Sequence, residues 1–142
     1  MSAVRDPLRV ERYAACAASV AELWALVGDL ARLDEWTDAT LVAAPPRWQE
    51  GAAATIALDG RERTWRVLTL RERTWELAAE LEQGRVGAGC HVVDEGARTR
   101  LVLVATLAPA GSRWKARTVE LPAMARRLER WAAAAVRVAS PQ

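Results

Sequence analysis

The sequence predicts an α+β protein in which a curved antiparallel sheet of about seven strands, in the order β-α-α-β6-α, wraps around one long C-terminal helix. Three observations support this class. A capped helical segment follows the first strand, strand-like stretches joined by hairpin turns fill the middle, and the last stretch has one apolar stripe at helical spacing. The 142 residues fit a single domain, 1-142, with frayed termini at 1-7 and 140-142.

Composition and charge exclude several classes of protein. The chain is 51% hydrophobic and 27% charged, which excludes disorder of the whole chain. Its net charge is +2 and Arg alternates with Glu, so we expect no nucleic acid as a partner. There is one histidine, His91, and Cys16 and Cys90 lie far apart, so no metal or other cofactor is expected, and a disulfide is left open. The absence of about 18 consecutive apolar residues and of a signal-like start predicts a cytoplasmic protein with no integral membrane contact.

The first third of the chain is predicted to hold one strand and two short helices. Residues 8–16 alternate between apolar and polar side chains, as a half-buried strand does. Ser19 and Glu22 form a capping box, in which each side chain accepts from a free backbone N–H of the other residue. Apolar residues at helical spacing continue to Trp36, and Gly28-Asp29 divides them into two helices.

The middle of the chain reads as six strands. Asp59-Gly60 is a strong signal for a two-residue hairpin, and a further turn is expected at Gln83-Gly84. Strands joined by such turns form an antiparallel meander. Gly87 and Gly89 inside one strand indicate a bulge or a close approach of neighbouring chains. The predicted strands are 41–44, 51–58, 61–70, 74–82, 86–93 and 98–107.

The last segment, from about Leu121 to Ala139, is predicted to be one long helix after a loop at 108–112. Pro122 fits its first turn, where a missing N–H costs nothing. Apolar residues form one stripe, and arginines including Arg127 take the other sides. Because this helix alone is long enough to cover the sheet, a space is expected between the two.

The opening of the chain resembles the START-like superfamily, also called SRPBCC or helix-grip, which includes polyketide cyclase/dehydrase and birch-pollen-allergen-like proteins. The resemblance rests on Ala21–Trp24, Val27, Asp29, Leu33 and Glu35-Trp36, and more weakly on Gly51, Trp65, Val67 and Thr99-Arg100-Leu101 after the Gly96 turn. It implies the helix-grip fold, with a hydrophobic tunnel between the sheet and the long helix. The element order covers nearly the whole chain.

What the resemblance implies about function is broad, because one fold serves several functions. The leading hypothesis is a protein that binds a small hydrophobic molecule, polyketide-like or lipid-like, and acts as a polyketide cyclase or dehydratase without a cofactor. A non-catalytic carrier of such molecules is the first alternative. The second alternative is a protein-interaction module, co-chaperone-like or toxin-like, with a filled tunnel.

Several side chains are candidates to line the tunnel, each with plain core packing as its alternative. Trp65 and Trp75 on neighbouring strands would form an aromatic wall, and Trp114 beside the loop before the helix would gate the mouth. The remaining candidates are Leu77 on the sheet and Met124, Leu128 and Trp131 on the helix.

Two polar residues are candidates for proton transfer. His91 has a side chain that titrates near neutral pH and would serve as acid or base if it faced the tunnel. Cys90 must then face the opposite side of the strand. Tyr13 on the first strand would orient a carbonyl oxygen through its phenol.

Overall fold

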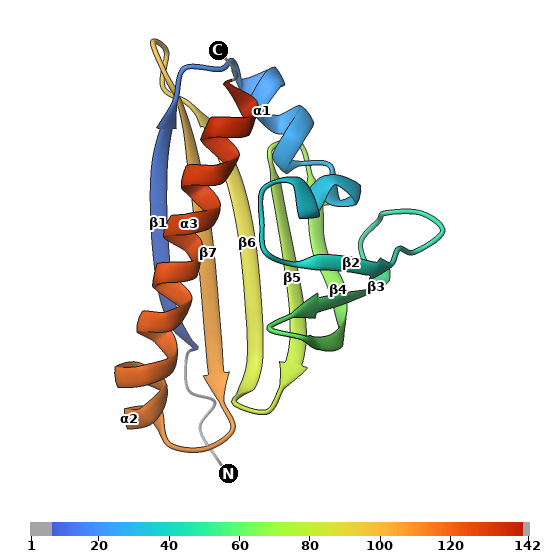
Figure 1. The fold of residues 1–142 in the computed structure, drawn as a ribbon, viewed down its shortest axis with the longest axis vertical. Helices are drawn as coiled ribbons and strands as arrows, with labels where there is room; N and C mark the ends of the chain where they lie inside the picture. Colours follow the sequence, from blue (N-terminus) through green and yellow to red (C-terminus); the bar gives the residue numbers. More distant parts are fainter. Residues whose placement is uncertain (1–6, 141–142) are drawn as a thin grey trace.

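The structure is a computed structural model that describes residues 7–140, and it shows a seven-stranded antiparallel sheet with a long helix across it (Figure 1). The strands lie in the order β1-β7-β6-β5-β4-β3-β2, which confirms the predicted class. The termini predicted to be frayed fall outside the described residues, apart from Pro7 and Ser140. The strands are β1 (Leu8–Cys16), β2 (Thr40–Ala43), β3 (Ala53–Leu58), β4 (Arg61–Arg71), β5 (Thr74–Leu81), β6 (Gly84–Asp94) and β7 (Thr99–Pro109).

Two short helices, α1 (Val20–Val27) and η1 (Leu30–Glu35), follow β1 as predicted. The capping box is formed, because the Ser19 hydroxyl accepts from the Glu22 N–H and the Glu22 carboxylate accepts from the Ser19 N–H. The chain then turns, and the Asp29 carboxylate accepts from the Ala31 N–H to begin η1. Local sequence signals therefore set both helix starts.

The C-terminal helical stretch begins earlier than the sequence predicts. It comprises α2 (Arg113–Lys115), a π-helical turn η2 (Ala116–Glu120) and α3 (Leu121–Ala139). Ser112 caps its start by accepting from the Lys115 N–H. The π-helical turn ends at Glu120, two residues before Pro122, which has no N–H to donate. The helical stretch therefore runs through Pro122 and does not begin there. No helix within residues 7–140 is long and apolar enough to cross a bilayer.

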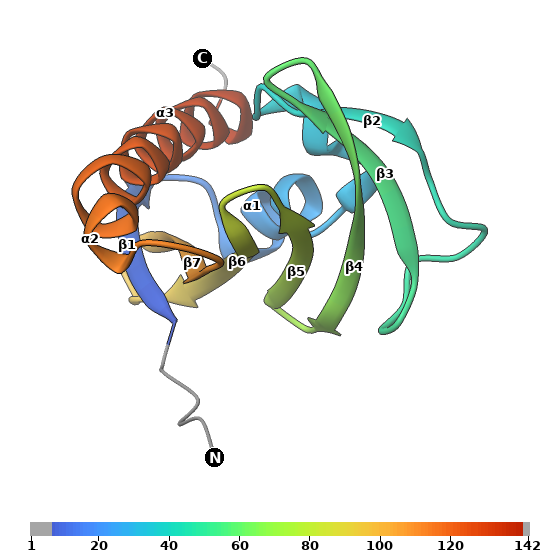
Figure 2. The same cartoon turned by 90° about the horizontal axis from the view of Figure 1, so that it is seen from below.

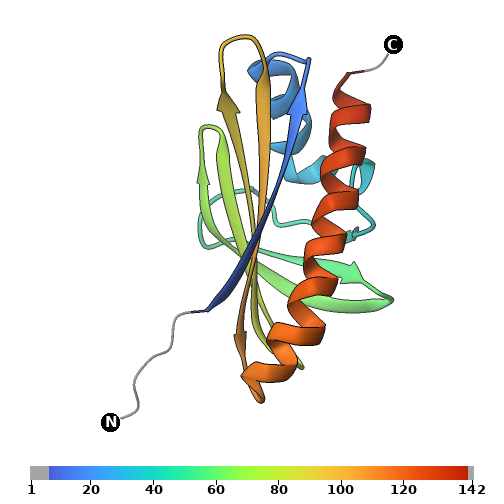
Figure 3. The ribbon, with the colours of Figure 1, turned by 90° about the vertical axis from the view of Figure 1, so that its left-hand side faces the viewer.

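The inner face of the sheet holds the apolar core. The sheet curls around α3 when seen from below, and α3 packs along β1 and β7 (Figure 2). Leu101, Leu103 and Leu107 point inward from β7 at alternate positions and are fully buried. Seen from the side, α3 covers one face of the sheet, and none of the described helices covers the other (Figure 3).

Glycines in one turn and in one strand behave as the sequence predicts. Asp59 and Gly60 have φ of 53° and 74°, the left-handed backbone of a tight hairpin turn. At Gly87 there is no bulge, since β6 pairs in regular register with β5 and β7. There is instead a close approach, because a Cβ on Gly87 would lie 2.3 Å from the Thr106 Oγ1.

Candidate functional site

A pocket of about 240 Å³ opens between α3, the β3–β4 hairpin and the β5–β6 turn. It lies on the inner side of the sheet, at the place where the sequence predicts a space beside the helix. Its apolar wall consists of Ile56 and Leu58 on β3, Trp65 on β4 and Leu81 on β5. Its other lining residues are polar: Asp59, Arg61, Arg63, Glu82, Gln83 and Arg127.

Arginines dominate the charge of this pocket, with three of them against two carboxylates among the lining residues. Arg61 pairs with Glu82 at 3.0 Å, and Arg63 pairs with the same carboxylate. A hydrogen bond from its own backbone N–H, followed by the two cations, lowers the pKa of the Glu82 carboxyl below its ordinary value. Glu82 is therefore anionic at neutral pH.

Arg127 joins the helix to the hairpin across the mouth of the pocket. Its guanidinium donates to the Asp59 carboxylate at 2.6 Å and lies 3.6 Å from the Asp38 carboxylate. Asp38 in turn accepts from the Trp131 indole N–H at 2.5 Å. The Arg127 side chain is only 23% exposed, so this contact is partly shielded from solvent.

Behind the pocket the interior is filled by tryptophans. Trp36 and Trp131 meet edge to face, with ring centroids 6.2 Å apart. Trp75 is 2% exposed and its indole N–H donates to the Val27 carbonyl at 2.7 Å, which fastens β5 to α1. These rings pack in the part of the interior near α1, whereas the pocket lies beside the β5–β6 turn.

The structure therefore divides the predicted ligand-binding residues. Trp65 lines the pocket. Most other candidates are part of the packed core between the sheet and α3: Trp75 and Leu77 on β5, and Leu128 and Trp131 on α3, are buried there. Met124 on α3 is half-buried against this core. Trp114 stands apart from them on α2 and is 74% exposed.

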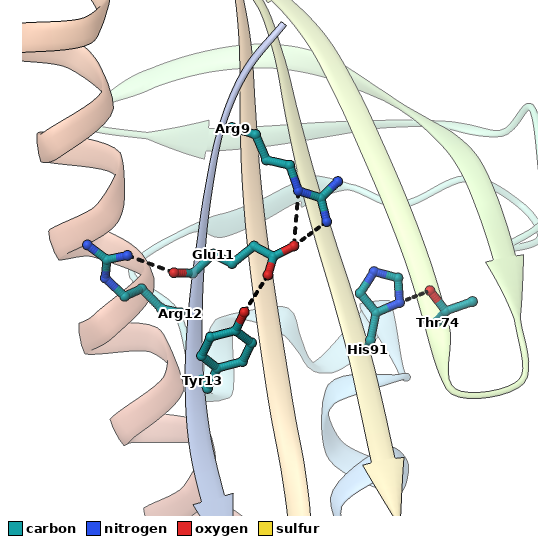
Figure 4. Close-up of polar contacts among 6 residues, drawn as sticks. All are labelled: Arg9, Glu11, Arg12, Tyr13, Thr74 and His91. Carbon is teal, nitrogen blue, oxygen red and sulfur yellow. Dashed lines mark hydrogen bonds and ion pairs between the residues drawn. The ribbon is translucent and has the colours of Figure 1, made fainter.

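The two predicted catalytic residues lie on the outer face of the sheet, away from the pocket (Figure 4). The His91 Nδ1 is 2.6 Å from the Thr74 hydroxyl, while its neighbour Cys90 is fully buried on the inner face. The Tyr13 phenol donates to the Glu11 carboxylate at 2.5 Å, which raises the pKa of Tyr13. This placement separates both groups from any ligand held beside α3.

A second hollow, of about 350 Å³, lies on this outer face around His91. Gly87 and Gly89 form part of its floor, and Arg9, Glu76 and Arg85 stand around it. Residues of the sheet and Pro7 line this hollow, whereas the inner pocket lies between the sheet, the β3–β4 hairpin and α3. Ligand sites in proteins are commonly formed between such layers, so the inner pocket is the better candidate.

The sequence analysis did not predict that arginines line the pocket, although signals were present for Arg63 and Arg127. Arg63 has the same strand parity as Trp65, so the two face the same side. The prediction that Arg127 lies away from the apolar stripe is wrong: it lies one helical turn before Trp131 and reaches the pocket.

Comparison with known proteins identifies the fold. No family model and no curated protein matches the sequence. Solved structures do match, among them a hypothetical protein of Helicobacter pylori with a TM-score of 0.72 at 14% identity, over 99% of this chain and 98% of that one. Ara h 8.0201 matches with a TM-score of 0.65 at 12% identity, over 92% of this chain and 96% of that one. The chain has the helix-grip fold.

A third helix-grip neighbour is norcoclaurine synthase of Thalictrum flavum, solved with a transition-state analogue. Its TM-score is 0.61 at 14% identity, over 94% of each chain. The resemblance stated from the sequence is thus confirmed at the level of fold. At such identities the shared fold does not assign an activity.

Proposed function

We propose that this protein binds a small apolar molecule that carries an anionic group, in the pocket beside α3. One observation supports this most directly: an apolar wall that includes Ile56 and Trp65 stands under a rim of three arginines. The wall would hold the body of the ligand, and the arginines would hold its charge.

The ion pairs of the rim can be exchanged for a ligand. Arg61 and Glu82 are both exposed, and such pairs contribute about 0–1 kcal/mol to stability, so replacing Glu82 by a ligand anion at Arg61 costs little. A guanidinium offers two parallel N–H donors to a carboxylate, sulfonate or phosphate. The charge of the lining residues is already positive before a ligand arrives.

The size of the pocket limits what it can hold. Sites for drug-sized ligands are usually about 300–1,000 Å³, and this one is about 240 Å³. The ligand is therefore small, or the β3–β4 hairpin moves outward to admit it. Only the contact between Arg127 and Asp59 ties the tip of that hairpin to α3 by a hydrogen bond among the described residues.

A biosynthetic enzyme is the second candidate, because one helix-grip neighbour is named as a synthase. In this pocket the Glu82 carboxylate would be the proton acceptor, since His91 and Tyr13 are on the other face. Its lowered pKa makes it a weak base, which favours the binding protein over the enzyme.

Two fluorescent probes test the proposal. 1-Anilinonaphthalene-8-sulfonate has an aromatic body and a sulfonate, and N-phenyl-1-naphthylamine has nearly the same body without the charge. We expect saturable binding of the sulfonate probe at one site per chain, weakened roughly tenfold by Arg127→Gln through loss of a charge-assisted contact. Binding of the neutral probe should change little, and Trp65→Ala should weaken both.

Arg130→Gln, on an exposed part of the same helix, is the matched control. Arg63→Gln repeats the test without breaking the contact between α3 and the β3–β4 hairpin, because that contact is made by Arg127. Sulfonate binding that is insensitive to Arg127→Gln, Arg63→Gln and Trp65→Ala alike would contradict the proposal.

A further inference from the structure

One tryptophan does not belong to the core. Trp114 on α2 is 74% exposed, which sets it apart from the tryptophans buried in the interior. Val119, five residues further on, is 54% exposed. Tryptophan is enriched at interfaces with partners and at membrane surfaces, where one part of its ring system is apolar and its N–H meets water.

Basic residues surround this tryptophan. Residues 113–119, here called the basic tip, contain Arg113, Lys115 and Arg117 and no acidic residue. Within residues 7–140, neither Lys115 nor Arg117 forms an ion pair. Their charge is therefore available to an outside partner.

The geometry of the helical turn directs these groups outward together. Ala116 is buried against the body of the protein at 1% exposure. At about 100° per residue, Trp114 points away from the side on which Ala116 is buried, with Lys115 and Arg117 to either side. The basic tip thus presents an indole flanked by two cations, the combination that suits the boundary between lipid headgroups and acyl chains.

The basic tip lies at the same end of the molecule as the pocket. The loop before α2 is joined to the β5–β6 turn, because the Ala110 N–H donates to the Gln83 carbonyl at 2.9 Å. Gln83 is itself a lining residue of the pocket. Figure 1 shows α2 and the β5–β6 turn at the lower end of the molecule.

We propose that the basic tip docks this protein on an anionic lipid surface, with the Trp114 indole inserted at the headgroup level. Docking would turn the pocket end toward the bilayer. Exchange of a ligand between the docked protein and the bilayer depends on the proposed function. Docking alone does not depend on the proposed function.

Charge and apolar contact are both needed for such docking. Each Lys or Arg near an anionic leaflet contributes about 1 kcal/mol, or roughly fivefold in affinity, and an apolar insertion adds a second signal. A single indole and the two cations Lys115 and Arg117 predict weak and reversible binding. Salt at about 1 M shortens the range of electrostatic attraction to about 3 Å and should release the protein.

Vesicle co-sedimentation of the full chain measures this directly. We expect binding to vesicles of phosphatidylglycerol and phosphatidylcholine, and little binding to phosphatidylcholine alone. Trp114→Ala should reduce the partition coefficient roughly tenfold, through the lost apolar contact. Arg117→Gln should reduce it about fivefold. A lipid brominated on its acyl chain should quench the tryptophan fluorescence of the native protein. In Trp114→Phe, quenching should fall to the background level of the buried tryptophans.

Two variants at other places serve as controls. Tyr13→Ala removes another exposed aromatic ring, 57% exposed on the outer face, and Arg98→Gln removes an exposed cation in the β6–β7 turn at the opposite end. Neither should change the partition coefficient.

Three results would overturn the proposal: equal losses in the control variants, equal binding to neutral vesicles, or binding to a single-stranded oligonucleotide but not to vesicles. The probe titration for the pocket is made without lipid, so failure of docking and failure of ligand binding are distinguished.

Discussion

The two ends of this molecule differ in what covers the same sheet. At the end near α1, Trp75 is buried and its indole N–H donates to the Val27 carbonyl. At the end near α2, the sheet is covered by the β3–β4 hairpin and α3, which meet through Arg127 and Asp59, and a pocket remains. Strand β5 runs from one end to the other, with Trp75 at its start and Leu81 at its end.

The difference between the two ends shows that the alternation of side chains along a strand does not by itself create a binding site. Trp75 and Leu81 have the same parity and face the same way. One is buried because a helix packs against it, and the other borders a pocket because charged side chains meet above it. Charged groups keep water, and so they leave space where apolar groups would close it.

The largest expected effect contrasts a tryptophan from each end. Trp75→Ala should lower the free energy of unfolding by about 3–5 kcal/mol, because it leaves a cavity and an unpaired carbonyl on Val27. Trp114→Ala should change it by no more than about 0.5 kcal/mol, because the ring is exposed. Urea denaturation followed by circular dichroism measures both. Similar losses from the two variants would show that the ends are not packed differently.

A second contrast concerns the turns at the two ends. Gly84 has a φ of 133°, and a Cβ there would lie 2.2 Å from the Ala108 carbonyl oxygen. Gly84→Ala should therefore cost roughly 2–4 kcal/mol, from overpacking and backbone strain together. Gly96 has a φ of 82° with nothing within 4 Å of such a Cβ, so Gly96→Ala should cost only about 1–2 kcal/mol of strain.

Thermal and urea unfolding of the two glycine variants give the comparison. If the Gly96→Ala variant were the less stable of the two, the tight junction between the β5–β6 turn and the end of β7 would not be present in solution.

The smallest expected effect is the pH response of the open end. The folded-state pKa of Glu82 lies below its ordinary value of 4.5, so its contribution to stability is present above that value and is lost as the pH falls through the folded pKa. A protonated Glu82 would also release Arg61 and Arg63 to a ligand. Binding of the sulfonate probe should therefore tighten below about pH 4.5, since a sulfonate stays ionised.

Probe titrations at successive pH values measure this response. Glu82→Gln should bind the probe more tightly at pH 7 and lose the dependence on acid. The same acid dependence in Glu82→Gln and in the native protein would assign it to another group.

Much of the fold could be predicted because its signals are local. The Ser19 and Glu22 capping box, the break at Gly28-Asp29 and the Asp59-Gly60 hairpin each depend on residues that are neighbours in the sequence. The start of the last helix was misplaced because two local signals competed. Pro122 is typical of the first turn of a helix, yet Ser112 caps the helical stretch ten residues earlier in the sequence. The turn between them is π-helical, which sequence patterns rarely indicate.

The site could be predicted only in part, because its residues come together from distant segments. The sequence offered Trp65 and Trp75 as one wall of the site but could not show which face of each strand points inward. On β6 both faces carry small or apolar residues, so parity did not show that His91 faces outward. Likewise the helical stripe did not show that Arg127 turns to the pocket, since its partner Asp59 lies on a hairpin 68 residues earlier.

The sequence by itself determined the elements, their order and the antiparallel meander, since capping, turns and periodicity depend on near neighbours. Only the tertiary structure decided which tryptophans are packed, which arginines line the pocket and that Trp114 is left outside. The reason is that a side chain's surroundings depend on residues far away in the chain. Trp75 finds its acceptor 48 residues earlier, and Trp131 finds its acceptor 93 residues earlier.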